Sequence, residues 1–435
     1  MPEAPVGHKD PHSGRTSSFP RATVGPWTVF GVCSALFIMS MFYRVSAAII
    51  APELTLDLSL NPRGLGLVGG VFFYAFALVQ IPLGVLLDRT GAKRTILALN
   101  LIGVFGAILF SRATGLHDAV IGRTLLGIGM AANLMGSLKL FINWFDQNRF
   151  ATLSGLIISM GTIGTLAATS PLALLVKSLG WRNSFLVLAG IHSLVILIFT
   201  LLVRNHPTDA PHGHARQRSA KGPAPAGLPL PEALGRLFRN KDYWAISFSI
   251  FLRYGSFASI QALWAGPFLM DLLGLSTVTA GNLLLILSVG YILGAPFGGY
   301  VSDRVLRSRK WAMVYAISVS ALAILVWSRW RPDYPVALLG LLLFVSGFFN
   351  AFNQISFAHI RDLMPREMSG TAMSGINVFT MTGAGVFIHG LGGMMEILQA
   401  GSETSGDLYR LAFLICFAAV ALSVLLYTLT TDSRS

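Results

Sequence analysis

Charged side chains are scarce in this chain, and cysteine is nearly absent. Asp, Glu, Lys and Arg make up only 12% of the 435 residues, whereas a soluble domain carries about 25%. The two cysteines, Cys33 and Cys416, both lie in apolar runs, so no disulfide framework is expected. Nucleophile–base and metal-ligand sets are also missing at helix spacing, which argues against an enzyme or a metal site. With 54% hydrophobic residues, the chain is predicted to be a membrane protein.

Acidic residues are missing in particular from the interiors of the long apolar runs. The nearest acids stand at the ends of those runs: Glu53, Asp57, Asp118, Asp271 and Glu396. Four basic residues, by contrast, are assigned to the interiors: Arg44, Arg123, Lys139 and Arg253. An ionisable group inside a membrane is costly and marks function by default. Cations without carboxylate partners therefore indicate a site that receives an anion, and the planar guanidinium of arginine suits carboxylate or phosphate.

Twelve membrane spans are predicted from the apolar runs. Each holds about 20 residues, enough at ~1.5 Å per residue to cross a ~30 Å hydrocarbon core. Their approximate ranges are 26–51, 66–87, 95–113, 119–143, 151–175, 183–203, 243–268, 279–301, 311–328, 335–358, 371–397 and 408–430. The predicted fold is an all-α membrane protein, and the even number of spans places both chain ends on one side.

A polar segment divides the spans into two sets of six. Residues 205–242 are rich in Pro, Gly, Ala and charge, which is typical of a mobile linker, and their last part could form a short amphipathic helix. The expected organisation is a cytoplasmic tail at 1–25, a six-helix bundle at 26–204, the linker at 205–242, a second bundle at 243–430 and a cytoplasmic tail at 431–435.

The net charge of +13 reflects topology and not nucleic-acid binding. With the N-terminus inside, 21 of the 32 Lys and Arg fall in cytoplasmic segments and 7 in periplasmic loops. This bias follows the positive-inside rule and predicts that both termini are cytoplasmic. The first 25 residues are polar and do not resemble a cleavable signal peptide, so the first span is expected to act as the insertion signal. Compact loops and short tails favour a bacterial inner membrane.

Similar sequences follow the second span of each set. GVLLDRTGAKR contains Asp88-Arg89, and GYVSDRVLRSRK contains Asp303-Arg304. ATLSGLI (151–157) and TAMSGIN (371–377) open the fifth and eleventh spans. Offsets of 215 and 220 residues fit one duplicated six-helix unit. Such duplication is typical of transporters, with the binding site near mid-membrane between the halves.

These motifs resemble those of the major facilitator superfamily of transporters. The first is similar to the family's loop motif between helices 2 and 3, with matches at Gly84, Asp88, Arg89, Gly91, Lys93 and Arg94. RTLLGIGMAA, which begins at Arg123, resembles the family's helix-4 pattern. The resemblance implies two pseudo-symmetric bundles, with the loop motif as a cytoplasmic gate that joins them. The basic residues could instead serve only as topology signals. The second copy keeps Asp303 and Arg304 but has no counterpart of Gly91, so a gating role there is less secure.

The resemblance also places Arg44 and Arg253 on equivalent helices, 1 and 7, which line the central cavity in the family fold. Organic-phosphate exchangers of the superfamily are similar in placing one Arg on each of these helices. Arg44 lies roughly 12 Å from the outer end of its span, and Arg253 roughly 15 Å from the inner end. We expect both to bind substrate. Arg123 could serve substrate or structure, and Lys139 is expected to snorkel to the surface.

Uncharged polar side chains could complete the site, or could instead hold helices together. The candidates are Tyr43, Tyr74, Gln80, Asn133, Tyr254, Gln261, Asn282, Asn350, Asn353 and Gln354. Asn350 and Gln354 fall on one helix face. His389 is a candidate proton carrier, although a histidine hydrogen-bonded between helices is the alternative.

We therefore expect a secondary transporter that moves a small organic anion, a carboxylate or organic phosphate, by alternating access. Coupling is expected to protons or to a counter-anion. A drug–proton antiporter of the same fold is the alternative, but it would want an intramembrane acid. A sensor on this fold is a third possibility. The expected partners are the anionic small molecule and the lipid bilayer. No cofactor, metal or nucleic acid is expected, and the chain is expected to be a monomer.

Overall fold

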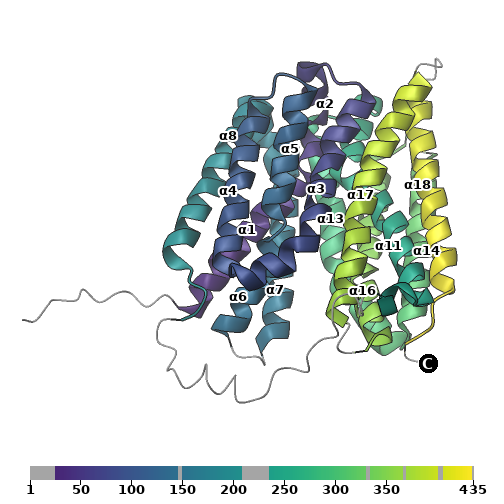
Figure 1. Ribbon diagram of the computed structural model, residues 1–435. Helices are drawn as coiled ribbons and strands as arrows, with labels where there is room; N and C mark the ends of the chain where they lie inside the picture. The colour runs from purple at the N-terminus through teal and green to yellow at the C-terminus, as the bar shows by residue number, and fades with distance from the viewer. Residues whose placement is uncertain are drawn as a thin grey trace, which may run out of the picture.

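The computed structural model describes residues 25–145, 149–207, 235–329, 334–365, 369–399 and 405–433, and the secondary structure in these ranges is helical throughout (Figure 1). The helices of the first half are α1 (Pro26–Val45), α2 (Ala47–Leu58), α3 (Pro62–Arg89), α4 (Ala92–Ser111), α5 (Leu116–Met130), α6 (Asn133–Trp144), α7 (Phe150–Ala167) and α8 (Ser170–Leu202).

The second half opens with a helix that is interrupted by wider π-helical turns: α11 (Lys241–Ser259), η2 (Ile260–Trp264), α12 (Ala265–Pro267) and η3 (Phe268–Leu272). The remaining elements are α13 (Thr277–Tyr300), the π-helical η4 (Val301–Val305), α14 (Arg309–Trp327), α15 (Val336–Asn350), the 3-10 turn η5 (Ala351–Asn353), α16 (Gln354–Leu363), α17 (Ser369–Gln399) and α18 (Ser405–Thr428).

Polar side chains in the short connections start several of these helices. Asn61 accepts a hydrogen bond from the Gly64 N–H at 2.8 Å, and Asn240 accepts from the N–H groups of Asp242 and Tyr243. Ser276 and Ser308 cap α13 and α14 in the same way. Each cap satisfies a backbone donor that the first helical turn leaves without a partner. These caps therefore help to fix where α3, α11, α13 and α14 begin.

These elements trace the twelve predicted crossings, which confirms the predicted twelve-helix fold. Several crossings consist of two or more pieces, such as α1 with α2 and α5 with α6. The long α8 belongs to two crossings, because Gly180 takes φ 74° inside it and reverses the chain. Ten of the described stretches are long and apolar enough to span a membrane, and α7 is a shorter apolar helix. The seventh crossing, from α11 to η3, is broken by its π-helical turns.

The first crossing is longer than the sequence predicted, because it continues past Pro52 to Leu58 instead of ending near residue 51. Proline has no N–H, so the carbonyl oxygen of Ala48, four residues earlier, has no intrahelical donor at this turn. That oxygen faces Gly266 of α12, where an added Cβ would lie only 1.8 Å from it. The proline therefore frees a carbonyl group at the point where the two halves meet.

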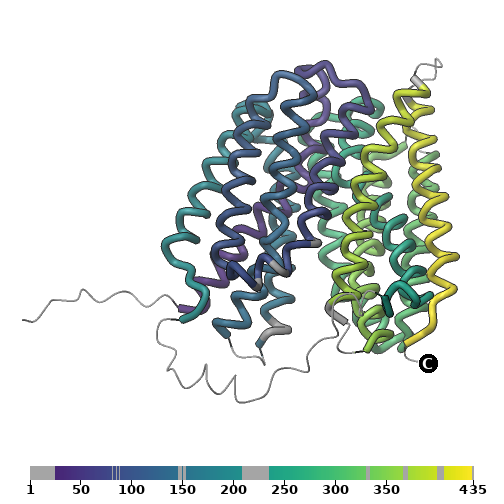
Figure 2. The backbone as a smooth tube through the Cα atoms, viewed as in Figure 1, coloured from purple at the N-terminus to yellow at the C-terminus, as the bar shows by residue number. Residues whose placement is uncertain are grey.

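The two bundles stand side by side, and α1 begins at the same end of the molecule as that at which α18 ends (Figure 2). We call this end, where α1 begins and α18 ends, the terminal face, and the opposite end the far face. The halves pack closely toward the far face. Gly66 and Gly70 of α3 lie against α17, where an added Cβ would approach the carbonyl oxygens of Ile388 and Gly385 to 2.8 Å. Small residues of this kind let membrane helices approach backbone to backbone.

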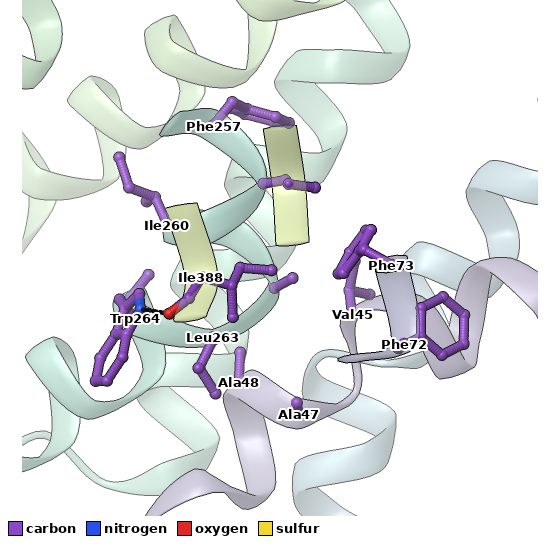
Figure 3. Close-up of a cluster of buried hydrophobic side chains, with 14 of the residues drawn as sticks. Val45, Ala47, Ala48, Phe72, Phe73, Phe257, Ile260, Leu263, Trp264 and Ile388 are labelled. Carbon is purple, nitrogen blue, oxygen red and sulfur yellow. Dashed lines mark hydrogen bonds between the residues drawn. The ribbon is translucent and has the colours of Figure 1, made fainter. Parts of the chain in front are cut away.

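An apolar cluster fills the junction between the halves (Figure 3). Ala48 of the first half lies beside Leu263 of η2, and the Trp264 indole N–H donates to the carbonyl oxygen of Ile388 at 3.1 Å. Two polar contacts also cross between the halves on this side. Asn61 donates to Glu396 at 2.6 Å, and Ser170 donates to Asn282 at 2.6 Å. Apolar packing and hydrogen bonds together close the far face in this conformation.

We predict that Gly266→Val opens this junction, because no valine side chain fits beside the Ala48 carbonyl. Leu56 and Ile397 lie on opposite halves and are 79% and 76% exposed, so both positions can carry spin labels. In the variant, a larger share of the molecules should show a long distance between the two labels. Gly390→Val is the matched control, since an added Cβ there meets nothing within 4 Å. Equal distance distributions in the two variants would contradict the prediction.

Candidate functional site

Arg44 stands beside the break in the first crossing. α1 ends at Val45 and α2 begins at Ala47, so Arg44 occupies the last turn of α1. Its guanidinium lies 5.0 Å from the centre of the Phe76 ring on α3, a cation–π contact. Its Nε atom is buried and has no hydrogen-bond partner among the described residues. Arg44 therefore retains an unused donor in the interior of the fold.

Arg253 lies deep in α11 of the second half and is only 1% exposed. Its Nη2 atom donates to the Oδ1 atom of Asn353, which lies in the 3-10 turn between α15 and α16. Its Nε atom is buried without a partner among the described residues. As with Arg44, a neutral group orients the guanidinium and one donor remains unused.

The charges of both arginines act on Tyr291 of α13. Its hydroxyl lies within electrostatic range of Arg44 from the first half and of both Arg253 and Tyr254 from the second. Gln354 places its Nε2 atom 3.5 Å from the same hydroxyl. We call Arg44, Arg253, Tyr291, Asn353 and Gln354 the arginine site. Four of these residues were predicted from the sequence. Tyr291 was missed, because a single tyrosine in an apolar helix carries no distinctive signal.

Arg123 serves the structure of the first half. It is 1% exposed, and it donates to the carbonyl oxygens of Tyr43 at 2.8 Å and Val68 at 3.3 Å. Its guanidinium lies 4.9 Å from the centre of the Phe72 ring, one turn of α3 away from the ring below Arg44. The Tyr43 carbonyl precedes the break in the first crossing, so Arg123 braces that break. Its Nη2 atom is buried and unpaired among the described residues.

A buried polar network ties four helices of the first half together, and sequence reasoning did not predict it. Asn100 of α4 donates to Asn133 of α6 at 2.6 Å, and Asn133 donates to the Leu36 carbonyl of α1 at 3.1 Å. His192 of α8 lies 3.0 Å from the Asn100 Oδ1 atom, and its ring lies 5.9 Å from the ring of Tyr43. The structure thus places the predicted Asn133 and Tyr43 inside the first bundle and away from the arginine site.

Several other predicted residues lie at helix contacts outside the arginine site. Gln80 donates to the Ala131 carbonyl at 3.0 Å, in the break between α5 and α6. Tyr74 packs against Gly385 at the junction of the halves, and Asn282 accepts the hydrogen bond from Ser170 there. Gln261 is half-buried in η2.

Asn350, by contrast, borders a closed cavity in the second half. The cavity lies next to Phe257 and Ser346, and the Asn350 Oδ1 atom is buried without a partner among the described residues.

Two predicted ionisable residues lie near opposite ends of the molecule. His389 borders a pocket of about 550 Å³ near the far face, together with Arg63 and Glu396. Lys139 donates to the Leu87 carbonyl at 2.7 Å, near the end of α3 at the terminal face. Neither belongs to the arginine site, so proton transfer by His389 remains a prediction.

The predicted gate motif forms the turn between α3 and α4 at the terminal face. Gly91 takes φ 81°, a conformation that strongly favours glycine. Lys93 bonds through its N–H to Asn205 and through its ammonium to the Thr200 carbonyl, both at 2.9 Å. These contacts stay within the first half. An added Cβ at Gly84 would meet nothing within 4 Å, and Arg89 and Arg94 are exposed.

The side chain of Asp88 lies outside the described side chains, so the gate function remains a prediction. The second copy of the motif makes its described ion pairs within its own half. Asp303 pairs with Arg309 at 3.2 Å, and Arg309 also pairs with Asp362 at 2.7 Å. Arg304 is exposed. Among the described residues no cluster of His, Cys, Asp and Glu has the arrangement of a metal site.

The helical architecture and apolar crossings define a multi-pass integral membrane protein. The sequence model of the Major Facilitator Superfamily matches residues 32–286 and 246–435, which together cover most of the chain. The chain belongs to this family of transporters.

Relatives with known names support the family and differ in substrate. The chain is 26% identical over 288 residues to the "Probable sulfoacetate transporter SauU" of Cupriavidus necator, a match that covers 64% of this chain and 65% of the relative. The chain thus spans just under two thirds of that relative's length. It is 24% identical to a "D-galactonate transporter" of Escherichia coli, covering 89% and 91% of the two chains. Both named substrates are small anions.

Solved structures show the same fold. A bacterial homolog of the human lysosomal transporter Spinster, in an inward-facing and unoccupied conformation, aligns with a TM-score of 0.75 and 16% identity over 93% of this chain and 96% of that one. A D-xylose–proton symporter aligns with a TM-score of 0.71 and 13% identity over 94% and 98%. At these identities the likeness concerns architecture alone.

We predict that Asn100→Leu destabilises the first bundle by about 1–3 kcal/mol, because Asn133 and His192 would keep buried polar atoms without their partner. Thermal unfolding of the purified protein in detergent would measure this as a lower midpoint. Asn183→Leu is the control, since exposed Asn183 bonds, among the described residues, only to the Leu179 carbonyl across the bend at Gly180. A loss of stability no larger than the control's would show that the network adds nothing.

Proposed function

We propose that this transporter moves a small organic anion, a carboxylate or an organic phosphate, through a site built on Arg44 and Arg253. One observation carries the proposal. Arg44 is held inside the fold by an aromatic ring and Arg253 by an amide. Each has a buried Nε donor without a hydrogen-bond partner, and neither pairs with a carboxylate among the described residues. A guanidinium in a poorly hydrated site is a strong partner for an oxyanion.

The placement of the arginines also suits a transport cycle. Arg44 belongs to the first bundle and Arg253 to the second, and Tyr291 stands within range of both. An anion bound by both guanidinium groups would therefore touch both halves at once. Rocking of the halves about this site would expose it to one side of the membrane and then to the other. The closed far face corresponds to one end state of such alternating access.

We further propose that the terminal face lies in the cytoplasm of a bacterial inner membrane. The bias of Lys and Arg toward the segments at this end supports the orientation. In this orientation the conformation described here is closed toward the outside. The anion would then be bound or released on the cytoplasmic side.

The test is a thermal-shift screen of the purified chain with D-galactonate, sulfoacetate, glycerol 3-phosphate, neutral sugars and cationic dyes. An anion present at 100 times its dissociation constant should stabilise the protein by about 2.7 kcal/mol. Arg44→Ala and Arg253→Ala should each remove most of that shift. Arg410→Ala should retain it, because Arg410 is exposed and pairs with Asp407 near the far face.

Two results would count against the proposal. Full stabilisation by anions in both arginine variants would mean that these side chains only support the fold. Stabilisation by cationic dyes alone would favour the alternative of a drug–proton antiporter.

A further inference from the structure

A second buried histidine lies near the terminal face and is not part of the arginine site. His359 of α16 is fully buried. Its Nδ1 atom lies 2.9 Å from the Tyr427 hydroxyl of α18, and its Nε2 atom lies 2.9 Å from the carbonyl oxygen of Thr431. Both ring nitrogens therefore have partners, although the side chain has no contact with solvent.

These two partners can serve both protonation states of the ring. A carbonyl oxygen only accepts, so the Nε2 atom carries hydrogen in either state. In the neutral ring, Nδ1 accepts a hydrogen bond from the Tyr427 hydroxyl. When Nδ1 gains a proton, it donates to the oxygen of that hydroxyl, which can both donate and accept. One hydroxyl rotation accommodates the change, and no buried atom loses its partner.

The charges around His359 come from two helices and the end of the chain. Asp242 at the start of α11 and Asp432 after α18 attract a proton to the ring, while Arg309 of α14 repels it. Arg309 is itself paired with Asp303 and Asp362. Tyr427 is the remaining titratable neighbour, and α17 presents no titratable side chain from residue 369 to 382. These charges act on a proton at the ring in opposite directions, and burial of the side chain opposes its charged form.

The same tyrosine connects His359 to the arginine site. The Tyr427 side chain is 1% exposed and lies within electrostatic range of Arg253. Asn353, the hydrogen-bond partner of Arg253, precedes His359 by six residues, roughly 9 Å along the tenth crossing. Tyr427 is therefore in contact with His359 and within electrostatic range of Arg253.

We propose that His359 carries the proton that is transported with the anion. The inference rests on the proposed function, because His359 would take up its proton in response to an anion bound to Arg253. That anion would cancel the positive charge of the guanidinium, which makes a proton on the nearby imidazole more favourable. The proton comes ultimately from bulk solvent and adds to Nδ1, the ring becomes a cation, and no other bond changes. By reciprocity, a protonated His359 strengthens anion binding by the same factor.

The coupling can be measured on the full-length protein in detergent with D-galactonate and sulfoacetate as probes. Proton uptake on anion addition is followed with a pH-sensitive dye in weak buffer, and anion affinity is measured at pH 5.5 and pH 8. The unmodified protein should take up a proton and bind about tenfold more tightly at pH 5.5. His359→Gln should bind with the affinity of the unmodified protein at pH 8, but without proton uptake and without pH dependence.

Two further variants complete the design. Tyr427→Phe keeps the ring but removes the hydroxyl between His359 and Arg253, so it should reduce the pH dependence even if His359→Gln does not fold. His117→Gln is the control, because His117 is exposed at the start of α5 and should leave coupling unchanged.

The outcomes separate the two proposals. No binding of either probe to the unmodified protein would overturn the anion function, and this inference with it. Binding without proton uptake would overturn the inference and leave the anion function standing. Unchanged pH dependence in both His359→Gln and Tyr427→Phe would overturn the inference, and so would loss of pH dependence in His389→Gln in place of His359→Gln.

Discussion

A guanidinium group inside a membrane needs protein groups that replace its water, and this requirement shapes the protein. Removing a charge from water is costly unless other groups replace the water. The chain does so with neutral groups: a phenylalanine ring under Arg44, backbone carbonyls for Arg123 and an amide for Arg253. None of these cancels the positive charge. The interior therefore keeps a positive potential that an anion can neutralise, and a permanent internal carboxylate would remove it.

The three arginines divide into two roles according to what holds them. Arg123 bonds through two of its three nitrogens to the carbonyl oxygens of Val68 in α3 and of Tyr43 beside the break in the first crossing, so it works as a brace. Arg44 and Arg253 are held more lightly and from opposite bundles. Their shared neighbour is a tyrosine hydroxyl. Rigid support in one half thus fixes the position of Arg44, while the contact between the halves decides how far it lies from Arg253.

The sequence was sufficient for the architecture because apolar length and the duplicated motif are local signals. It also singled out Arg44, Arg253, Asn353 and Gln354 as candidate binding residues, since polar groups in apolar runs are rare. It could not separate binding residues from packing residues, because Asn133 and Asn353 look alike in sequence and differ only in which helices surround them. Tyr291 and the His192 network depend on the approach of four or more helices, and the first crossing continues past Pro52 where Ala48 packs against Gly266 of the other half. Such tertiary arrangements leave no trace in a single apolar run.

The π-helical turns of the seventh crossing have a geometric consequence. A π turn closes its hydrogen bond over five residues and an α turn over four, so each contains one residue more than an α-helix needs. If η2 (Ile260–Trp264) returned to α-helical spacing, everything beyond it would rotate by roughly 100° about the helix axis. Trp264 would leave the Ile388 carbonyl, and Gly266 would turn away from Ala48. A change in the winding of the seventh crossing would therefore also break the contacts that hold the two bundles together at the far face.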